Sequence, residues 1–170
     1  MVRIIPALWR VLGFILLGTL PWMMPGWVSE ARANMVFSKF GFIDAAGHEV
    51  IPLKFQHGFS FSQGLAPVKQ GEHWHYIDPK GNKVIQLPIV VMEARPFAED
   101  LAPVRVGQKW GYIDRSGRRV LEAKFDEAGP FVDGRAAVRV GSRWEVGGWK
   151  GGKYGYIDRQ GNLVIPAQFD

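Results

Sequence analysis

The 170-residue chain contains no cysteine. This absence excludes a disulfide framework, a thiol nucleophile and a metal site built on thiolates, so the fold must be held together by packing alone. Runs of like charge are also missing, because lysines and arginines are interspersed with acidic residues in a chain of formal net charge +5. This distribution is typical of a mixed solvated surface, and we expect no nucleic-acid partner.

A hydrophobic stretch long enough to cross a membrane is absent too. The apolar run near the start covers residues 11–24, whereas a spanning helix needs ~20 such residues. Two arginines belong to this region, and an A-x-A pattern precedes Asn34. A basic start, a short apolar core and small residues at a cleavage point predict a secretory signal peptide over residues 1–33. We expect residues 34–170 to be exported, periplasmic or secreted, without a stable membrane anchor after cleavage.

Glycine and proline are abundant, at 21 and 11 residues, which predicts many tight turns rather than long helices. The turns belong to an internal repeat. A segment of the form aromatic-x-aromatic-Ile-Asp occurs four times, and a glycine follows each aspartate after two residues. The four copies start at Phe40, Trp74, Trp110 and Tyr154 and end at Asp44, Asp78, Asp114 and Asp158. The aspartates are 34, 36 and 44 residues apart, which indicates tandem units of one architecture.

The third copy defines the expected structure of one unit. Residues 101–106 and 110–114 are rich in β-branched and aromatic side chains and predict two strands, and residues 119–121 begin a third strand after the turn at Gly117. Each unit is therefore expected to be a three-stranded antiparallel meander. A meander cannot bury both faces alone, so we predict an all-β domain of stacked units in an open solenoid-like array, with a closed propeller-like ring as the alternative. The last unit is incomplete.

A glycine lies in the middle of the second strand in three units, at Gly41, Gly111 and Gly155. Glycine weakens a strand unless something approaches the backbone closely, and we expect an aromatic ring of the adjacent unit to do so. The second unit has His75 at this position, which predicts looser or altered packing there.

This pattern resembles the WG repeat family of bacterial proteins. The resemblance rests on the Lys-Trp-Gly-Tyr-Ile-Asp-x-x-Gly motif that begins at Lys109, on the related motif that begins at Lys153, and on the Val-Ile-Pro-x-x-Phe-Asp segment that ends at Asp170. It covers residues 36–170. The first unit departs from the family in having Phe40 in place of tryptophan. The resemblance implies a repetitive β architecture and an interaction role, and it supplies no catalytic residues.

Two sets of side chains invite a metal hypothesis. The four turn aspartates resemble calcium ligands, but one carboxylate per unit falls short of the 6–8 oxygens that calcium takes. We therefore expect each aspartate to cap the amides of its own turn. His73 and His75 are two residues apart on a predicted strand and face one side. The other units lack both histidines, so we interpret them as chance surface placements and predict no metal and no cofactor.

The third interval is eight residues longer than the one before it, and such insertions commonly emerge on the binding face of a repeat protein. Its candidate binding residues are Arg143, Trp144, Trp149 and Lys150. These side chains are suited to stacking on a sugar or on a partner's aromatic ring. The alternative is a hairpin extension whose tryptophans only cover an exposed end.

No serine lies in a nucleophile elbow, and no glycine-rich phosphate loop is present. We therefore predict a non-enzymatic binding or scaffold module of the bacterial cell envelope that recognises protein or cell-wall polymer. The alternative is an accessory or inhibitory domain that acts on an envelope enzyme. Expected partners are a protein or a cell-wall glycan, together with self-association through the exposed ends of the array.

Overall fold

The structure, a computed structural model, describes residues 3–6, 39–146 and 148–170. All regular elements in these residues are β-strands, and none of the described segments forms a helix that is long and apolar enough to cross a membrane. The strands form four antiparallel sheets in chain order. The predicted all-β architecture is therefore confirmed.

The sheets share one plan. The first contains β1 (Arg3–Pro6), β2 (Phe40–Ile43) and β3 (Glu49–Phe55). The second contains β4 (His57–Gly58), β5 (Ala66–Gln70), β6 (His73–Ile77) and β7 (Lys83–Gln86). The third contains β8 (Val91–Ala94), β9 (Leu101–Val106), β10 (Lys109–Asp114) and β11 (Arg119–Phe125). The fourth contains β12 (Glu127–Val132), β13 (Arg135–Glu145), β14 (Gly148–Ile157) and β15 (Leu163–Phe169).

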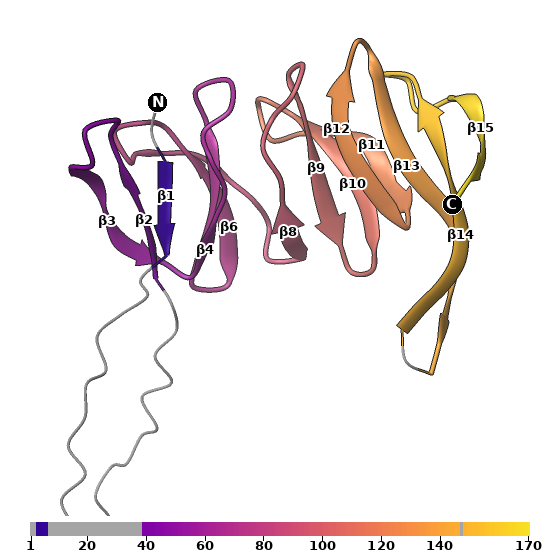
Figure 1. Cartoon of the computed structure of the whole chain (residues 1–170), viewed down its shortest axis with the longest axis horizontal. Coiled ribbons are helices and arrows are strands. Elements are labelled where there is room, and N and C mark those ends of the chain that lie inside the picture. Colours follow the sequence, from indigo (N-terminus) through magenta and orange to yellow (C-terminus); the bar gives the residue numbers. More distant parts are fainter. Residues whose placement is uncertain (1–2, 7–38, 147) are drawn as a thin grey trace, which may run out of the picture.

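The sheets follow one another along the long axis of the molecule in an open array, as predicted (Figure 1). Each of the last three sheets has one strand more than the expected three-stranded meander. The extra strands are β4, β8 and β12, each of which pairs with the first strand of the meander in its sheet. One residue separates β3 from β4 and β11 from β12, whereas four residues separate β7 from β8.

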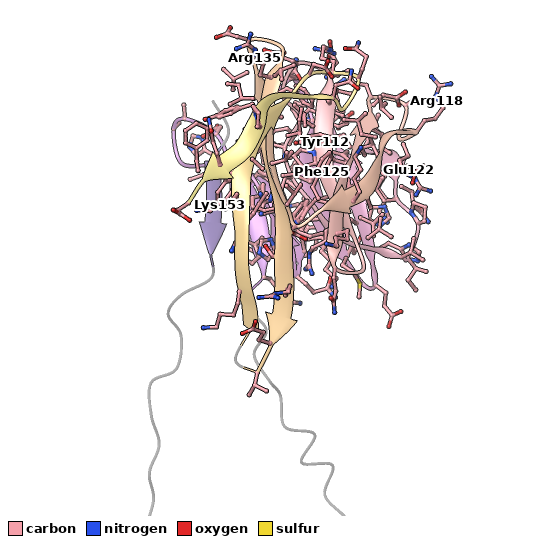
Figure 2. The ribbon with its side chains drawn as sticks, turned by 90° about the vertical axis from the view of Figure 1, so that its right-hand side faces the viewer. Tyr112, Arg118, Glu122, Phe125, Arg135 and Lys153 are labelled. Atoms are coloured by element: carbon pink, nitrogen blue, oxygen red, sulfur yellow. The ribbon has the colours of Figure 1, made fainter. Side chains whose placement is uncertain are left out.

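The core of the described residues consists of three clusters, and each of them spans one boundary between neighbouring sheets. Tyr112 and Phe125 of the third sheet are buried and lie inside the packed side chains when the array is viewed from its C-terminal end (Figure 2). The Tyr112 ring packs against Phe131 of the fourth sheet, with ring centroids 5.0 Å apart. Tyr76 and Phe97 make the same contact one boundary earlier, at 4.6 Å. The second and third sheets thus bury their aromatic faces against the phenylalanine of the next unit.

Tyrosine also links the sheets by a hydrogen bond. The Tyr76 hydroxyl donates to the backbone carbonyl of Arg95 at 2.8 Å, and the Tyr112 hydroxyl donates to that of Gly129 at 2.8 Å. Burial raises the pKa of both tyrosine hydroxyls, so they remain protonated donors. A buried hydroxyl needs such a partner, and the repeated tyrosine therefore fixes the distance between neighbouring sheets as well as filling the core.

The strand glycine is required by a bulge in the neighbouring strand, which corrects the prediction of an overlying ring. Between Trp110 and Tyr112 the chain advances two residues, while their partners Leu121 and Phe125 are four residues apart. The extra residues place strand β11 directly over Gly111. A Cβ there would lie 2.5 Å from the carbonyl oxygen of Leu121. Gly41 and Gly155 face equivalent backbone at 2.6 and 2.7 Å.

His75 is tolerated because the second sheet lacks this bulge. His75 and Tyr76 pair with Gln86 and Ile85 in regular register. The expected change in packing at His75 is therefore confirmed, and it takes the form of regular pairing at the position where the other sheets have a bulge. The expected surface position of His75 is wrong, since its side chain is only 3% exposed.

Strand β1 occupies the position that β5, β9 and β13 take in the other sheets, because it pairs with β2. Its four residues belong to the segment that the sequence predicts to be a signal peptide. The rest of that segment lies outside the described residues, so cleavage after residue 33 stays a prediction. Removal of β1 would leave β2 as an open edge of the first sheet.

Candidate binding site

The lengthened interval forms a hairpin that projects beyond the other sheets (Figure 1). Val106 and Lys109 of the third sheet are joined by two residues, whereas Val140 and Lys153, their counterparts in the fourth sheet, are joined by twelve. The insertion is therefore ten residues long. The aspartate spacings differ by only eight residues, because the third interval is compared with the second. The second interval is itself two residues longer than the first, through extra residues between β7 and β8.

The structure brings all four predicted binding residues together on this hairpin. Its register pairs Trp144 with Trp149 and Arg143 with Lys150, at the far end of β13 and β14. Arg143 and Lys150 are exposed, and the Arg143 guanidinium lies 3.8 Å from the carboxylate of Glu145. The hairpin thus places two cationic residues next to two tryptophan positions that pair directly across its strands.

The base of the hairpin is held by Asp126, whose side chain is almost fully buried. One carboxylate oxygen accepts the backbone N–H of Ser142 at 2.7 Å, and the other accepts the ammonium group of Lys109. Burial raises the pKa of Asp126, but the hydrogen bonds from Lys109 and Ser142 outweigh it, and the pKa lies below its ordinary value. Asp126 therefore stays charged and ties the hairpin to the third sheet.

A groove of about 410 Å³ lies beside this base, at the boundary between the third and fourth sheets. It is lined by Glu93, Arg95, Arg105, Gln108, Trp110, Asp126 and Glu127. The Arg95 guanidinium lies 4.0 Å from the centroid of the Trp110 ring, and Glu93 contacts Arg95 and Arg105 at 3.5 and 3.4 Å. Arg95 also donates to the backbone carbonyl of Ala128 at 2.9 Å, which fixes it across the boundary.

The groove combines hydrogen-bond donors and acceptors at close range. Two arginines supply forked N–H donors, and three carboxylates and one amide supply acceptors. Glu127 accepts the hydroxyl of Tyr154 at 2.6 Å, and this hydrogen bond, with burial, raises the pKa of Tyr154. This lining suits a ligand rich in hydroxyl and amide groups or a polar peptide backbone.

The sequence did not point to the groove. Its signal is visible only when units are aligned, since Glu93 and Arg95 occupy the positions of His57 and Phe59 in the second unit. In that unit the equivalent surface is aromatic, and the His57 ring lies 5.1 Å from Phe59. The replacement of aromatic rings by paired charges at these repeat positions could have distinguished the third unit from the second.

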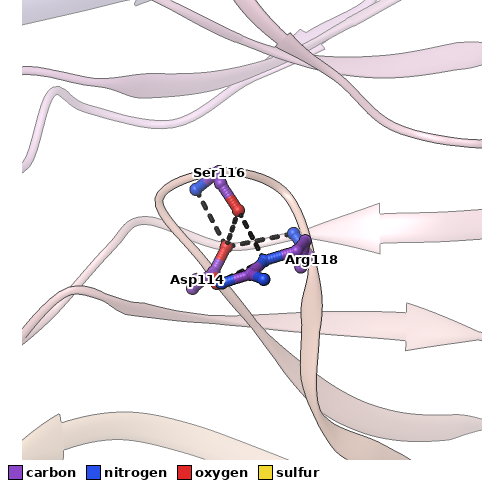
Figure 3. Close-up of polar contacts among 3 residues, drawn as sticks. All are labelled: Asp114, Ser116 and Arg118. Carbon is purple, nitrogen blue, oxygen red and sulfur yellow. Dashed lines mark hydrogen bonds and ion pairs between the residues drawn. The ribbon is translucent and has the colours of Figure 1, made fainter.

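The turn aspartates cap their own turns, as predicted. One oxygen of Asp114 accepts the backbone N–H groups of Ser116 and Arg118 at 2.9 and 3.0 Å, and the Arg118 side chain contacts the other oxygen (Figure 3). Asp44, Asp78 and Asp158 make the same backbone contacts. These hydrogen bonds lower the pKa of all four carboxyls. In each carboxyl, one oxygen accepts two amides of its own turn.

His73 and His75 both lie on β6, with ring centroids 6.2 Å apart. The Nδ1 atom of His73 lies 3.2 Å from the carbonyl oxygen of Leu87. Within the described residues, no three histidine or acidic side chains lie close enough to hold a metal ion.

These features define a class of protein: an open array of small antiparallel sheets with a polar groove and a projecting hairpin on one edge. The WG containing repeat matches the chain at residues 40–74, 76–110, 110–144 and 154–170. The matches cover more than half of the sequence, and the chain belongs to this family. No curated protein and no solved structure matches it.

Proposed function

We propose that this protein is a non-enzymatic binding or scaffold module of the bacterial cell envelope that recognises a protein or a cell-wall polymer. The observation that carries the proposal is the ten-residue lengthening of one hairpin beside a polar groove. Repeat proteins commonly bind through such insertions on one face. The envelope location rests on the predicted signal peptide.

The groove and hairpin complement each other chemically. The groove offers paired arginines and carboxylates, and the hairpin adds Arg143 and Lys150 at exposed positions. A polymer with alternating hydroxyl, amide and carboxylate groups, or an acidic peptide segment, would find partners along this edge. Because Asp126 joins the two parts, a ligand in the groove would also contact the base of the hairpin.

The experiment is capture from a bacterial envelope extract. The chain contains no cysteine, so one cysteine introduced at exposed Lys80, in a turn of the second sheet, provides a single attachment point away from the candidate site. A variant with Trp144→Ala and Trp149→Ala, attached in the same way, is the matched control. We expect the parent protein to retain an envelope protein or a cell-wall fragment that the double variant does not.

Melting temperatures of the two proteins distinguish binding from folding. If the double variant is as stable as the parent and retains nothing, the tryptophans act in recognition. If it loses stability while still capturing the same material, the hairpin only covers an end of the array and the proposed site is refuted. Retention of an active envelope enzyme whose activity falls on capture would favour the accessory role instead.

A further inference from the structure

The tip of the lengthened hairpin differs from the corresponding turns of the second and third sheets. Those turns, residues 71–72 and 107–108, consist of a glycine and a polar residue. The hairpin instead carries Val146 at its tip, and this side chain is fully exposed. Strand β13 continues for five residues beyond Val140, which places the tip about 16 Å beyond the level of the shorter turns. The array thus holds an apolar residue well away from its body.

The residues behind the tip form an ordered series of cross-strand pairs. Glu145 pairs with Gly148, and the two tryptophan positions pair next. Arg143 and Lys150 form the following pair. Successive pairs are about 3.3 Å apart along a strand, so the cationic pair lies roughly 7 Å behind the pair at the tip. Counted from its end, the hairpin presents an apolar residue, then an aromatic pair, then a cationic pair.

This order matches the layers of a membrane surface. Apolar side chains favour the acyl region, tryptophan is enriched at the level of the headgroups, and lysine and arginine are attracted to anionic headgroups. Peripheral segments bury their apolar part about 5–10 Å into this boundary. That depth takes in Val146 and the tryptophan positions, and it leaves Arg143 and Lys150 beside the headgroup charges.

The charge of the projecting part suits an anionic surface. Residues 141–146 and 148–152 contain two basic side chains, Arg143 and Lys150, and one acidic side chain, Glu145. Both basic residues are exposed. The Glu145 carboxylate lies 3.8 Å from the Arg143 guanidinium, so the acidic charge nearest the tip has a cation beside it.

The projecting part is a two-stranded ribbon. In the described residues, β12 pairs with β13 no further than Arg139, and β15 pairs with β14 no further than Tyr154. A two-stranded ribbon alone is only marginally stable in water. An external surface that covers the tryptophan positions would therefore stabilise the hairpin as well as bind it.

We propose that the tip of the lengthened hairpin binds reversibly to the surface of an anionic phospholipid membrane. Val146 and the tryptophan positions enter the boundary between headgroups and acyl chains, and Arg143 and Lys150 contact the headgroup phosphates. The groove at the base of the hairpin stays outside the bilayer and open to a ligand. The inference goes beyond the proposed function and rests on it only for the envelope location.

The test uses the full chain, which contains no cysteine, and places one environment-sensitive fluorophore on Val146→Cys. Val132→Cys is the matched control, because Val132 is an exposed valine beside the turn at the opposite end of β13. Each protein is mixed with vesicles of phosphatidylcholine alone, or of phosphatidylcholine and phosphatidylglycerol in equal parts. We expect a blue shift and a severalfold rise in emission at position 146 with the anionic vesicles, and neither change at position 132.

Charge variants of the labelled Val146→Cys protein separate lipid contact from contact within the protein. Each cation near an anionic surface contributes about a factor of five to binding. Arg143→Gln together with Lys150→Gln is therefore expected to raise the lipid concentration at half-maximal change more than roughly tenfold. Glu145→Gln is expected to lower this concentration, and added salt to raise it.

Three results would overturn the proposal. They are unchanged emission at position 146 with the anionic vesicles, an equal change at position 132, and an equal change with the zwitterionic vesicles. The assay contains no protein ligand and no cell-wall polymer, so its failure is distinguishable from failure of the capture experiment that tests the proposed function.

Discussion

The replacement of Gly111 by alanine tests why this glycine recurs. The new Cβ would lie 2.5 Å from the Leu121 carbonyl oxygen and 2.9 Å from the Ala123 nitrogen. Both are backbone atoms, so strand β11 must shift or lose its bulge. Overpacking of this kind costs about 1–3 kcal/mol, and contact with backbone favours the upper end. Removing the flexibility of glycine returns about 0.5–1 kcal/mol.

The net loss is then about 2 kcal/mol, which corresponds to a fall in melting temperature of roughly 4–8 °C for a chain of this size. Gly129→Ala is the matched control, because its Cβ would meet its nearest neighbour, the Ala137 carbonyl oxygen, at an ordinary 3.4 Å. Circular dichroism melting curves provide the measurement. A Gly111→Ala protein as stable as the parent, or a Gly129→Ala protein equally destabilised, would refute the bulge explanation.

Three further predictions concern stability. Burial, with the charges of Lys83 and His73, lowers the pKa of His75 below its usual 6.5. As pH falls, His75 therefore binds a proton in the unfolded chain before it does so in the folded protein, and the free energy of unfolding falls as pH drops below about 6.5. His75→Gln should flatten this part of the melting profile, and an unchanged slope would contradict the assignment. Tyr112→Phe should cost about 1 kcal/mol in chemical denaturation through its lost hydrogen bond, whereas Tyr156→Phe should be neutral. The four turn aspartates contribute stability above pH 3.8 that is lost as pH falls through their lowered pKa values. Acid titration followed by circular dichroism should show this loss. Replacement of all four aspartates by asparagine should abolish this pH dependence.

The order of the strands and the role of the turn aspartates could be predicted because both depend on short-range patterns. A strand such as Leu101–Val106 is visible in its own residues, and Asp114 reaches amides only two and four residues away. The stacking of units followed from the repeat itself, because each sheet repeats the apolar positions that need covering.

Features that depend on the neighbouring strand were missed. The bulge over Gly111 is a mismatch in length between two strands, which no single strand reveals. His75 was misplaced on the surface for the same reason, since its own strand does not show how β7 pairs with it. The groove was missed because Arg95 and Trp110 belong to different segments and are brought together only by sheet pairing.

The proposal that the lengthened hairpin and its groove form the binding edge is tested most directly by shortening the hairpin. Deletion of residues 143–150 leaves a four-residue loop between the paired residues Val140 and Lys153, a length that hairpins accept. The amount of envelope material retained by the immobilised chain is compared with that retained by this variant. We expect an unchanged fold and loss of the captured partner. Equal retention by both proteins would contradict the proposed binding edge.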